Sequence, residues 1–425
     1  MRRVAALSVT AALALTATGC LSSGDDGGGG SDTVTVWTSV DQPVSDGLEK
    51  AVKAKADADG IKIDWQRVEN INQLIMTKIQ ANDAPDIAMI PQPGVVADIV
   101  RRGAAYPLDD VVDMSALQSS MVPGTLDAGT VDGKLYGLLI SMNIKSLVWY
   151  NKPAWEKAGY TAPESIDQLN ALTDQMKKDG NTPWCMGIES DTATGWPATD
   201  WFEELIMKYG GPDVYNQWVT HEIPFDSDVV RQAAKEFEEL MFTEGNVLGG
   251  QKAISSTNFG TAGNPMFEDP PKCWMYKQGS FITGFFPDST TSDLDTNVGV
   301  FGFPWATEDQ KPVLGGGDLG VLMSDSDNAK KVMGYLSETD IGNDAAPNSS
   351  FISPHKDFDM SLYPNEITRQ VADVGYNATT FLFDGSDQMP GEVGAGSFWK
   401  EMTAWISGQQ DLDTTLKNID NSWPS

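Results

Sequence analysis

The side chains best suited to covalent catalysis are few, and they stand in no catalytic motif. The only histidines are His221 and His355, and the three cysteines, Cys20, Cys185 and Cys273, lie far apart. The chain has no Gly-x-Ser-x-Gly turn, no His-Glu-x-x-His, no Cys-x-x-Cys and no Walker loop. We therefore expect no enzyme, no catalytic residue, no bound metal and no cofactor.

Two further patterns partly match known binding motifs, but the residues around them do not fit. Residues 315–320 read Gly-Gly-Gly-Asp-Leu-Gly, but Val321-Leu322-Met323 predicts a strand where a dinucleotide site requires a helix. Residues 288–295 carry aspartates but lack the glycine and the final glutamate of a calcium loop. A glycosidase that uses two carboxylates stays an alternative, although no acid stands in a recognisable catalytic setting.

Charge and size narrow the class of protein. The formal net charge of -31 argues against nucleic acid and anionic lipid as partners, because both would be repelled. Neutral and cationic ligands remain open. A chain of 425 residues with 40% hydrophobic residues predicts a globular protein of two lobes. We expect most acids to be solvated, including the pairs Glu203-Glu204 and Glu238-Glu239.

The N-terminal residues have the zones of a secretory signal. Basic Arg2 and Arg3 precede an apolar run over residues 4–17, which is too short to span a bilayer permanently. The small residues before Cys20 resemble the bacterial lipoprotein signal, so we predict a signal peptide over residues 1–20 with Cys20 as the lipidation site. An ordinary signal peptide is the alternative. Residues 21–32, rich in glycine, predict a flexible tether.

The two cysteines other than Cys20 could form one disulfide. Outside the cytoplasm a Cys185–Cys273 disulfide would close a loop of about 90 residues and stabilise the fold by a few kcal/mol. Two buried free thiols are the alternative.

The first part of the mature chain alternates strands and helices. Residues 33–37, 61–65 and 86–90 alternate or run apolar as strands, and the segments between them have helical periodicity. We expect the first helix to be capped by Ser45 or Asp46 and to end at Gly60. Strand, helix, strand predicts an α/β sheet whose ligand lies at the carboxyl ends of the strands, near residues 38–42 and 91–94.

Several ordered segments carry a resemblance to a known family. They are Val36-Trp37-Thr38, Ala84-Pro85-Asp86-Ile87, Tyr106-Pro107-Leu108, Gly133-Lys134-Leu135-Tyr136-Gly137, residues 147–152, residues 389–399 and Ile406-Ser407-Gly408. In this order they resemble the extracellular solute-binding proteins of carbohydrate importers, in the maltose-binding protein group. Residues 195–201 and 383–387 look most like the actinobacterial α-glucoside-binding lipoproteins.

The resemblance implies an α/β fold of the periplasmic-binding-protein type. Two lobes are joined by three crossovers and close on a ligand by a hinge motion. The crossovers fall near residues 139–143, 281–285 and 315–319. The implied N-lobe covers residues 33–140 and 286–314, and the implied C-lobe covers residues 141–285 and 315–425.

The resemblance also implies a sugar site, for which the chain supplies two kinds of group. Aromatic rings stack on the apolar face of a pyranose, and short polar side chains pair with its hydroxyls. The stacking candidates are Trp196, Trp201, Phe286 and Trp399, with Trp201 equally readable as a buried helix anchor. The hydroxyl-binding candidates are Asp41, Gln42, Gln92, Asn143, Gly317 and Asp318, with Asp387 and Glu392 as weaker ones. The family often has an acid or Arg where Gln92 stands.

The partners follow from the same resemblance. We expect an α-glucoside di- or oligosaccharide of the trehalose or maltose type, captured for the permease subunits of an ABC transporter. The protein would be a monomer, extracellular, and held on the outer face of the cytoplasmic membrane by its lipid alone. A secreted lipoprotein glycosidase and a sugar sensor or adhesin without transport are the alternatives.

Overall fold

The computed structural model describes residues 33–305 and 311–424. The predicted signal peptide, the lipidation site Cys20 and the tether over residues 21–32 lie outside the described residues. Among the described helices, none combines the length and the apolar character that crossing a bilayer requires.

The larger sheet has six strands. They are β1 (Thr33–Thr38), β2 (Lys62–Arg67), β3 (Ile87–Ile90), β6 (Gly137–Ile144), β10 (Pro312–Leu322) and β11 (Thr380–Phe383). The order is β11-β10-β3-β1-β2, and β6 also pairs with β10. The first three strands are parallel, whereas β10 runs antiparallel to both β3 and β6 and parallel to β11. The predicted α/β sheet is confirmed.

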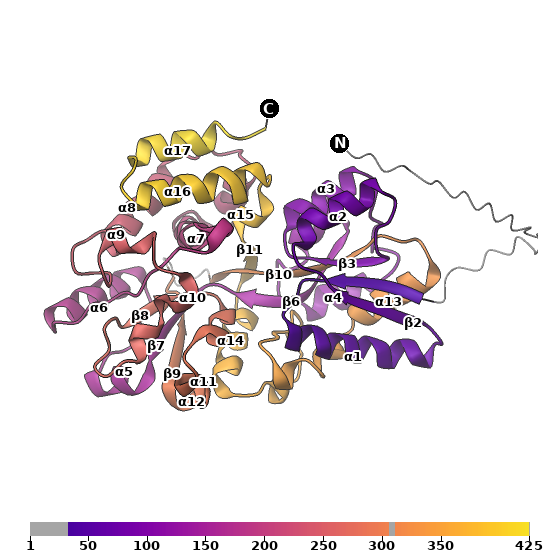
Figure 1. Cartoon of the computed structure of the whole chain (residues 1–425), viewed down its shortest axis with the longest axis horizontal. Coiled ribbons are helices and arrows are strands. Elements are labelled where there is room, and N and C mark those ends of the chain that lie inside the picture. Colours follow the sequence, from indigo (N-terminus) through magenta and orange to yellow (C-terminus); the bar gives the residue numbers. More distant parts are fainter. Residues whose placement is uncertain (1–32, 306–310, 425) are drawn as a thin grey trace, which may run out of the picture. The chain divides into compact units, whose positions relative to one another are not determined.

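A group of helices lies beside the β1, β2 and β3 part of this sheet (Figure 1). They are α1 (Gln42–Ala58), α2 (Ile71–Gln80), α3 (Pro93–Arg101) and α13 (Asp327–Leu336). The helix α1 begins three residues before the predicted Ser45, because Pro43 fits the first turn of a helix and Asp41 precedes it as the N-cap. Gly60, at a φ of 74°, follows its C-cap, close to the predicted end.

A second, antiparallel sheet consists of β7 (Leu147–Asn151), β8 (Met275–Lys277) and β9 (Val298–Gly302). The short β4 (Thr130–Val131) and β5 (Lys134–Leu135) pair separately. The remaining helices are α4 (Met114–Ser120), α5 (Lys152–Ala158), α6 (Ile166–Lys178), α7 (Trp196–Val219), α8 (Asp228–Met241), α9 (Gln251–Ile254), α10 (Phe259–Ala262), α11 (Asp288–Thr291), α12 (Leu294–Asn297), α14 (Glu366–Tyr376), α15 (Gly385–Gln388), α16 (Trp399–Ile406) and α17 (Leu412–Asp420).

These elements form two lobes. The first lobe, as we use the term, contains β1, β2, β3, α1, α2, α3 and α13. The second contains β7, β8, β9, β11, α5 to α12 and α14 to α17. The strands β6 and β10 run between the two groups (Figure 1). The chain returns a third time through residues 349–354, where Met142 donates its backbone N–H to Ile352 (2.9 Å) before α14 packs on β6 and β9.

Two segments lie on the opposite side from the expected boundaries. Residues 286–302 were expected in the N-lobe, but β9 pairs along the whole of β7. Residues 327–336 were expected in the C-lobe, but α13 packs on α1 and β1. The crossover expected near residues 281–285 is therefore replaced by the one at 349–354, because the chain after residue 285 continues in the second lobe.

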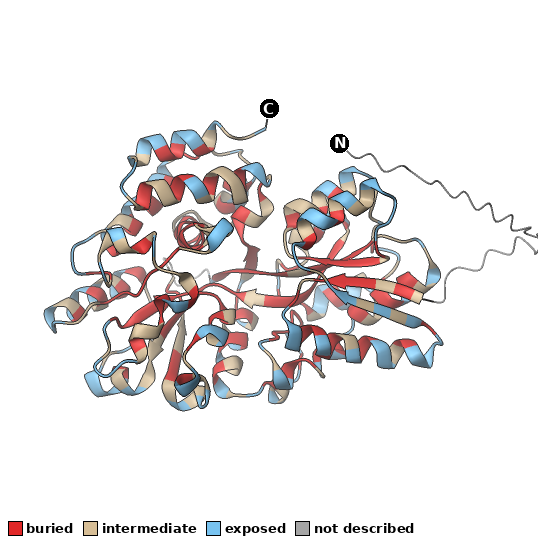
Figure 2. Cartoon of the chain, in the orientation of Figure 1, coloured by how far each residue is buried: buried red, intermediate tan, exposed pale blue. Residues whose placement is uncertain are grey.

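The strands that connect the lobes are buried along almost their whole length (Figure 2). All residues of β6 are buried except the half-buried Asn143, and all residues of β10 except Asp318. Away from them, the second lobe contains the predicted disulfide between Cys185 and Cys273, whose Cα atoms lie 5.3 Å apart. The half-buried Asn143 and Asp318 thus interrupt strands whose other residues are buried.

Candidate functional site

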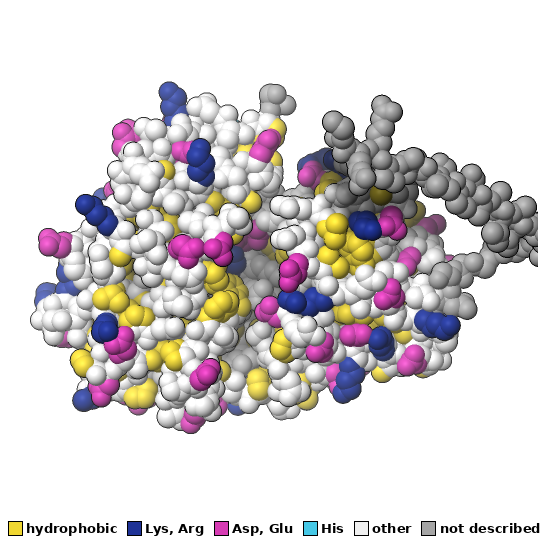
Figure 3. All heavy atoms as spheres, in the orientation of Figure 1, with side chains coloured by type: hydrophobic (Ala, Val, Ile, Leu, Met, Phe, Trp, Pro, Cys, Tyr) yellow, Lys and Arg dark blue, Asp and Glu magenta, His cyan; other side chains and the backbone are white. Residues whose placement is uncertain are grey.

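A polar cavity of about 210 Å³ lies where the lobes meet. The loop after β1 contributes Asp41 and the loop after β3 contributes Pro91, so the carboxyl ends of two parallel strands meet at its wall, as the sequence predicted. The space-filling view shows a hollow between the lobes on the face drawn (Figure 3). The full lining is Ser39, Val40, Asp41, Val44, Pro91, Ser141, Asn143, Phe281, Asp318 and Ser350.

The strands β6 and β10 direct three polar side chains into this cavity. Ser141 and Asn143 are two residues apart on β6, so they share one face of the strand. On β10 the pairing shifts register after Asp318, which lies opposite Ser141. Gly317 adopts a φ of 149°, and a Cβ there would lie 2.0 Å from the carbonyl oxygen of Ser141. Gly317 therefore allows the close approach of β10 to β6 just before the bulge between Asp318 and Leu319.

The polar side chains of the cavity have no hydrogen-bond partners in the part of the chain that the structure describes. Among the described residues, no side chain or backbone group forms a hydrogen bond with the side chains of Ser39, Asp41, Ser141, Asn143, Asp318 or Ser350. Asp41 and Ser350 are exposed, and Ser39, Asn143 and Asp318 are half-buried, so these polar groups are accessible to a ligand that enters the cavity. Carboxylates accept hydrogen bonds, hydroxyls do both, and the amide of Asn143 does both.

The cavity contains two neighbouring carboxylates, and the pKa of one of them is raised. Burial raises the pKa of Asp318 to about 7, and the neighbouring charge of Asp41 adds to the rise. The described residues that line the cavity include no Lys or Arg. The site therefore favours ligands rich in hydroxyl donors over anions.

A wider groove of about 830 Å³ adjoins the cavity and shares Asp41, Val44, Phe281 and Ser350 with it. Its remaining lining includes Gln42 and the guanidinium of Arg67, whose Nε donates to the carbonyl oxygen of Val40 (3.0 Å). Phe285, which is 48% exposed, also lines the groove. The cavity and the groove together offer a compact polar end and a broader, partly aromatic end.

One aromatic ring, that of Phe281, lines the cavity, and further rings lie behind it, outside the lining of both the cavity and the groove. Phe281, from the 3-10 helix over residues 280–285, lines the cavity and meets the ring of Trp196 edge-on, at 5.8 Å between centroids. Trp196 starts α7 and also contacts Phe259 at 4.9 Å. The backbone of Trp399 lies close to the start of α7 in space, because a Cβ on Gly195 would lie 2.4 Å from the carbonyl oxygen of Trp399. Trp196 and Trp399 are both half-buried, as stacking platforms require.

A buried ionic cluster lies behind these rings. The ammonium of Lys145, in the link between β6 and β7, donates to Asp200 (3.0 Å) and to Asp384. It also lies 5.4 Å from the centroid of Trp196. Although burial opposes its charge, Asp200 and Asp384 raise the pKa of Lys145 well above its ordinary value. Glu203 accepts hydrogen bonds from the backbone N–H groups of Gly385 (2.8 Å) and Ser386 (3.1 Å), and burial raises its pKa.

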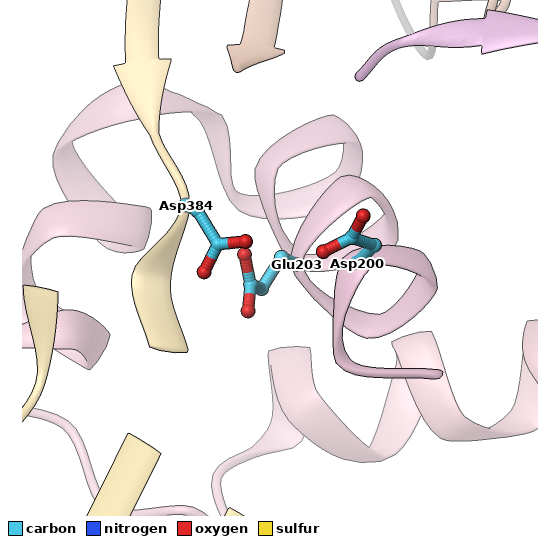
Figure 4. A group of neighbouring side chains, drawn as sticks. All are labelled: Asp200, Glu203 and Asp384. Atoms are coloured by element: carbon cyan, nitrogen blue, oxygen red, sulfur yellow. The ribbon is translucent and has the colours of Figure 1, made fainter. Parts of the chain in front are cut away.

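Three acids of this cluster, Asp200, Glu203 and Asp384, point toward one another (Figure 4). They bring ligand atoms close enough together to suggest a cation site. The ammonium of Lys145 already pairs with Asp200 and Asp384, and Glu203 accepts hydrogen bonds from the backbone N–H groups at the start of α15. The geometry therefore assigns these acids to a structural ion cluster and not to a metal.

The expectation that Glu203 and Glu204 are solvated is wrong. Both side chains are fully buried. Glu204 accepts from the hydroxyl of Ser146 (2.8 Å) and pairs with Lys208 (3.1 Å) and Lys277 (3.5 Å). The error arose because most of their partners, such as Ser146, Lys277 and Gly385, lie far away in the sequence, although Lys208 is only four positions after Glu204.

Three other predicted site residues lie outside the cavity, each for a different reason. Trp201 is 1% exposed among Trp184, Phe237 and Phe303, so it is the helix anchor that the sequence left as its second interpretation. Phe286 lines the groove but is 5% exposed, because its ring packs on other aromatic rings. Glu392 is exposed at the start of a π-helical segment and lines neither the cavity nor the groove.

The side chain of Gln92 does not line the cavity but forms hydrogen bonds with other side chains. Its side chain accepts from Asn72 (2.9 Å) and donates to Asp387 (2.8 Å). Trp399 donates through Nε1 to the hydroxyl of Ser386 (3.3 Å), next to Asp387. Of these contacts, the one between Gln92 and Asp387 joins the two lobes, and neither of these two residues lines the cavity.

Several lining residues were not predicted. Ser141 shares the strand face of Asn143, so period-two alternation along β6 could have found it. Phe281 lies in a segment that was expected to be a crossover, but the residue itself was not singled out. Ser350 and Arg67 come from distant segments and carry no local signal.

Comparisons with known proteins show the family of the chain. Residues 41–342 match the family described as bacterial extracellular solute-binding protein. The chain is 36% identical over 378 residues to the osmoprotective compounds-binding protein GgtB of Synechocystis sp., with 89% of each chain covered. It is also 36% identical over 382 residues to the alpha-glucosides-binding periplasmic protein AglE of Rhizobium meliloti, covering 87% of this chain and 82% of AglE.

Solved structures show the same fold at lower identity. The bacterial solute receptor AcbH superimposes with a TM-score of 0.78 at 17% identity, over 92% of this chain and 98% of AcbH. The sugar-binding protein MalE of Xanthomonas citri gives a TM-score of 0.71 at 15% identity, over 92% and 95% of the two chains. Two lobes that meet at a polar cavity, the match over residues 41–342 and the full-length relatives agree: the chain belongs to the bacterial extracellular solute-binding proteins.

Proposed function

We propose that this protein is the substrate-binding component of a carbohydrate ABC importer and that its ligand is an α-glucoside. The observation that carries the proposal is the polar cavity between the lobes, where Asp41, Asn143 and Asp318 lack partners among the described residues. A sugar offers many hydroxyls in a small volume, so it can pair with all of these groups at once.

The aromatic rings support the same ligand. Phe281 lines the cavity, with Trp196 behind it at 5.8 Å, so an apolar surface lies beside the polar groups. A pyranose ring has both a polar rim and an apolar face, and this combination of side chains suits both. The adjoining groove leaves room for a second sugar unit or another aglycone.

The relatives support the sugar class. AglE is named for alpha-glucosides, and other matches are named as sugar-binding proteins, including the multiple sugar-binding protein of Streptococcus mutans at 22% identity over 269 residues. The relatives are solute-binding proteins, so we infer binding and not turnover. We also propose that the chain is a monomer that is lipid-anchored through Cys20 on the outer face of the membrane and delivers its sugar to permease subunits.

One observation favours a second function, glycoside hydrolysis. Asp318 has a pKa raised to about 7 and lies near Asp41, and one acid of raised pKa beside a second carboxylate is the arrangement that glycosidases use.

A single titration series separates the two functions. The full chain is titrated with trehalose, maltose, isomaltose, sucrose and glucose by calorimetry and tryptophan fluorescence, and each mixture is then analysed for released glucose. We expect one-to-one saturable binding of at least one glucoside and no product. Product formation would establish the glycosidase, and silence for every sugar would contradict the α-glucoside assignment.

A further inference from the structure

Gln92 and Asp387 bring the two lobes into direct contact beside the cavity. Gln92 follows β3 as the N-cap residue of α3 in the first lobe, and its neighbour Pro91 lines the cavity. Asp387 lies on α15 in the second lobe. The side-chain amide of Gln92 donates to Oδ1 of Asp387 at 2.8 Å.

Both partners are held in position before they meet. Asn72 of α2 donates to Oε1 of Gln92 at 2.9 Å, which fixes the orientation of the amide. On the other side, the backbone N–H of Asp387 donates to Asp384 at 2.9 Å, and Asp384 is paired with Lys145. A hydrogen bond between two groups that are already ordered requires little further loss of conformational entropy.

The backbones also approach closely at this point. Gly94, in the first turn of α3, faces the segment after Asp387, and a Cβ at Gly94 would lie 2.9 Å from the carbonyl oxygen of Met389 and 3.2 Å from that of Asp387. Any side chain there would push α3 away from α15. Gly94 is in a helix, where Ala is the more favourable residue, so close approach is the feature that glycine supplies here.

We propose that Gln92, Gly94 and Asp387 form a latch that holds the two lobes together independently of the ligand. This inference rests on the proposed function, since it concerns closure of the same sugar site. Gln92 and Asp387, which the sequence suggested as sugar contacts, act in this way on each other. The latch lowers the free energy that a bound sugar must supply for closure, because the closed form is already populated.

The test measures small-angle X-ray scattering of the full chain without sugar. Gln92→Ala removes the donor and Gly94→Ala inserts a methyl group between the lobes. We expect both substitutions to increase the radius of gyration. The ratio of closed to open molecules should fall about tenfold, because this is the effect of losing one hydrogen bond to a carboxylate. Asp387→Ala should behave alike, whereas Asp387→Asn keeps an acceptor oxygen and should scatter like the parent.

Two matched controls separate the latch from general effects. Gln66→Ala removes a glutamine that donates to Asp64 within the first lobe at 2.7 Å, and Gly334→Ala adds a methyl group on α13 where no atom lies within 4 Å. Both should leave the scattering unchanged. Unchanged scattering for Gln92→Ala and Gly94→Ala would overturn the latch.

A sugar titration of the same variants then tests the consequence. We expect Gln92→Ala and Gly94→Ala to weaken the affinity for the sugar up to about tenfold, in proportion to the lost closed population. If the parent binds no sugar, the proposed function fails while the scattering still decides the latch.

Discussion

At the scale of single residues, polar side chains in the middle of this protein are of two kinds. Those of the cavity, such as Asn143 and Asp318, have no partners among the described residues. Those behind it, such as Lys145 and Asp384, are fully paired with one another. Unpaired groups are available to a ligand and paired ones maintain the shape of the site, so substitutions in the two sets should have different consequences.

Asp318 should make stability depend on pH. Its pKa is raised to about 7 in the folded protein, so between about pH 4 and pH 7 the unfolded chain releases this proton while the folded protein retains it. Stability should therefore fall as the pH rises through this window. We expect Asp318→Asn to match the parent at pH 4 and to be more stable by about 2 kcal/mol at pH 8, less than the whole shift would give because the carboxylate is partly exposed. Urea denaturation at the two pH values measures this, and equal stability at pH 8 would contradict it.

Lys145 should be needed for folding stability. Its removal leaves Asp200 and Asp384 buried without their cation, which costs about 3–5 kcal/mol. Lys50 is a matched control, because it pairs with Asp344 at 2.6 Å but is 73% exposed, and such pairs contribute about 1 kcal/mol or less. Chemical denaturation of Lys145→Met and Lys50→Met compares them, and similar losses for both would refute the structural role of the cluster.

Residues of the site could be predicted from the sequence where they directly follow a strand of the α/β sheet. Asp41 follows the first strand of an α/β sheet, and the carboxyl ends of such strands meet at the ligand. Ser350 was not predictable, since residues 349–354 have no periodicity and reach the cavity only through the third crossover. The burial of Glu203 was not predictable either, because it depends on Lys145, 58 positions before Glu203 in the chain, and on the start of α15.

At the scale of elements, β10 connects the lobes and carries the site. Its glycines 315–317 let neighbouring strands approach closely, and only Gly317 among them has a positive φ. The sequence predicted a crossover near these glycines and a strand directly after them. It placed the surrounding segments in the wrong lobes, because periodicity identifies a strand but not the sheet that the strand joins.

Gly317→Ala should disrupt this element. The new Cβ would meet the carbonyl oxygen of Ser141 at 2.0 Å, and a φ of 149° is unfavourable for alanine. We expect a loss of about 3 kcal/mol of stability, measured by thermal unfolding, together with loss of sugar binding. The neighbouring Gly316→Ala is the control, since its nearest atom would lie 3.8 Å away. If both variants unfold at the temperature of the parent, the bulge does not depend on glycine.

At the scale of the whole molecule, the account depends on two lobes that meet over one polar cavity. The two-lobe fold was predictable from chain length and from the ordered family motifs, and solved structures with TM-scores of 0.78 and 0.71 agree with it. How the lobes touch was not predictable, because the contact of Gln92 with Asp387 joins residues 295 positions apart.

The most direct test of the account is calorimetric titration of Asp318→Ala with the best-binding glucoside of the panel. Asp325→Ala is the matched control, because Asp325 lies beyond the end of the same strand, exposed and paired with Lys330 at 2.5 Å. The account predicts that Asp318→Ala weakens binding by about a hundredfold, since hydroxyls of the enclosed sugar lose their acceptor, while Asp325→Ala binds like the parent. Equal affinity of the two variants would contradict a sugar site in this cavity.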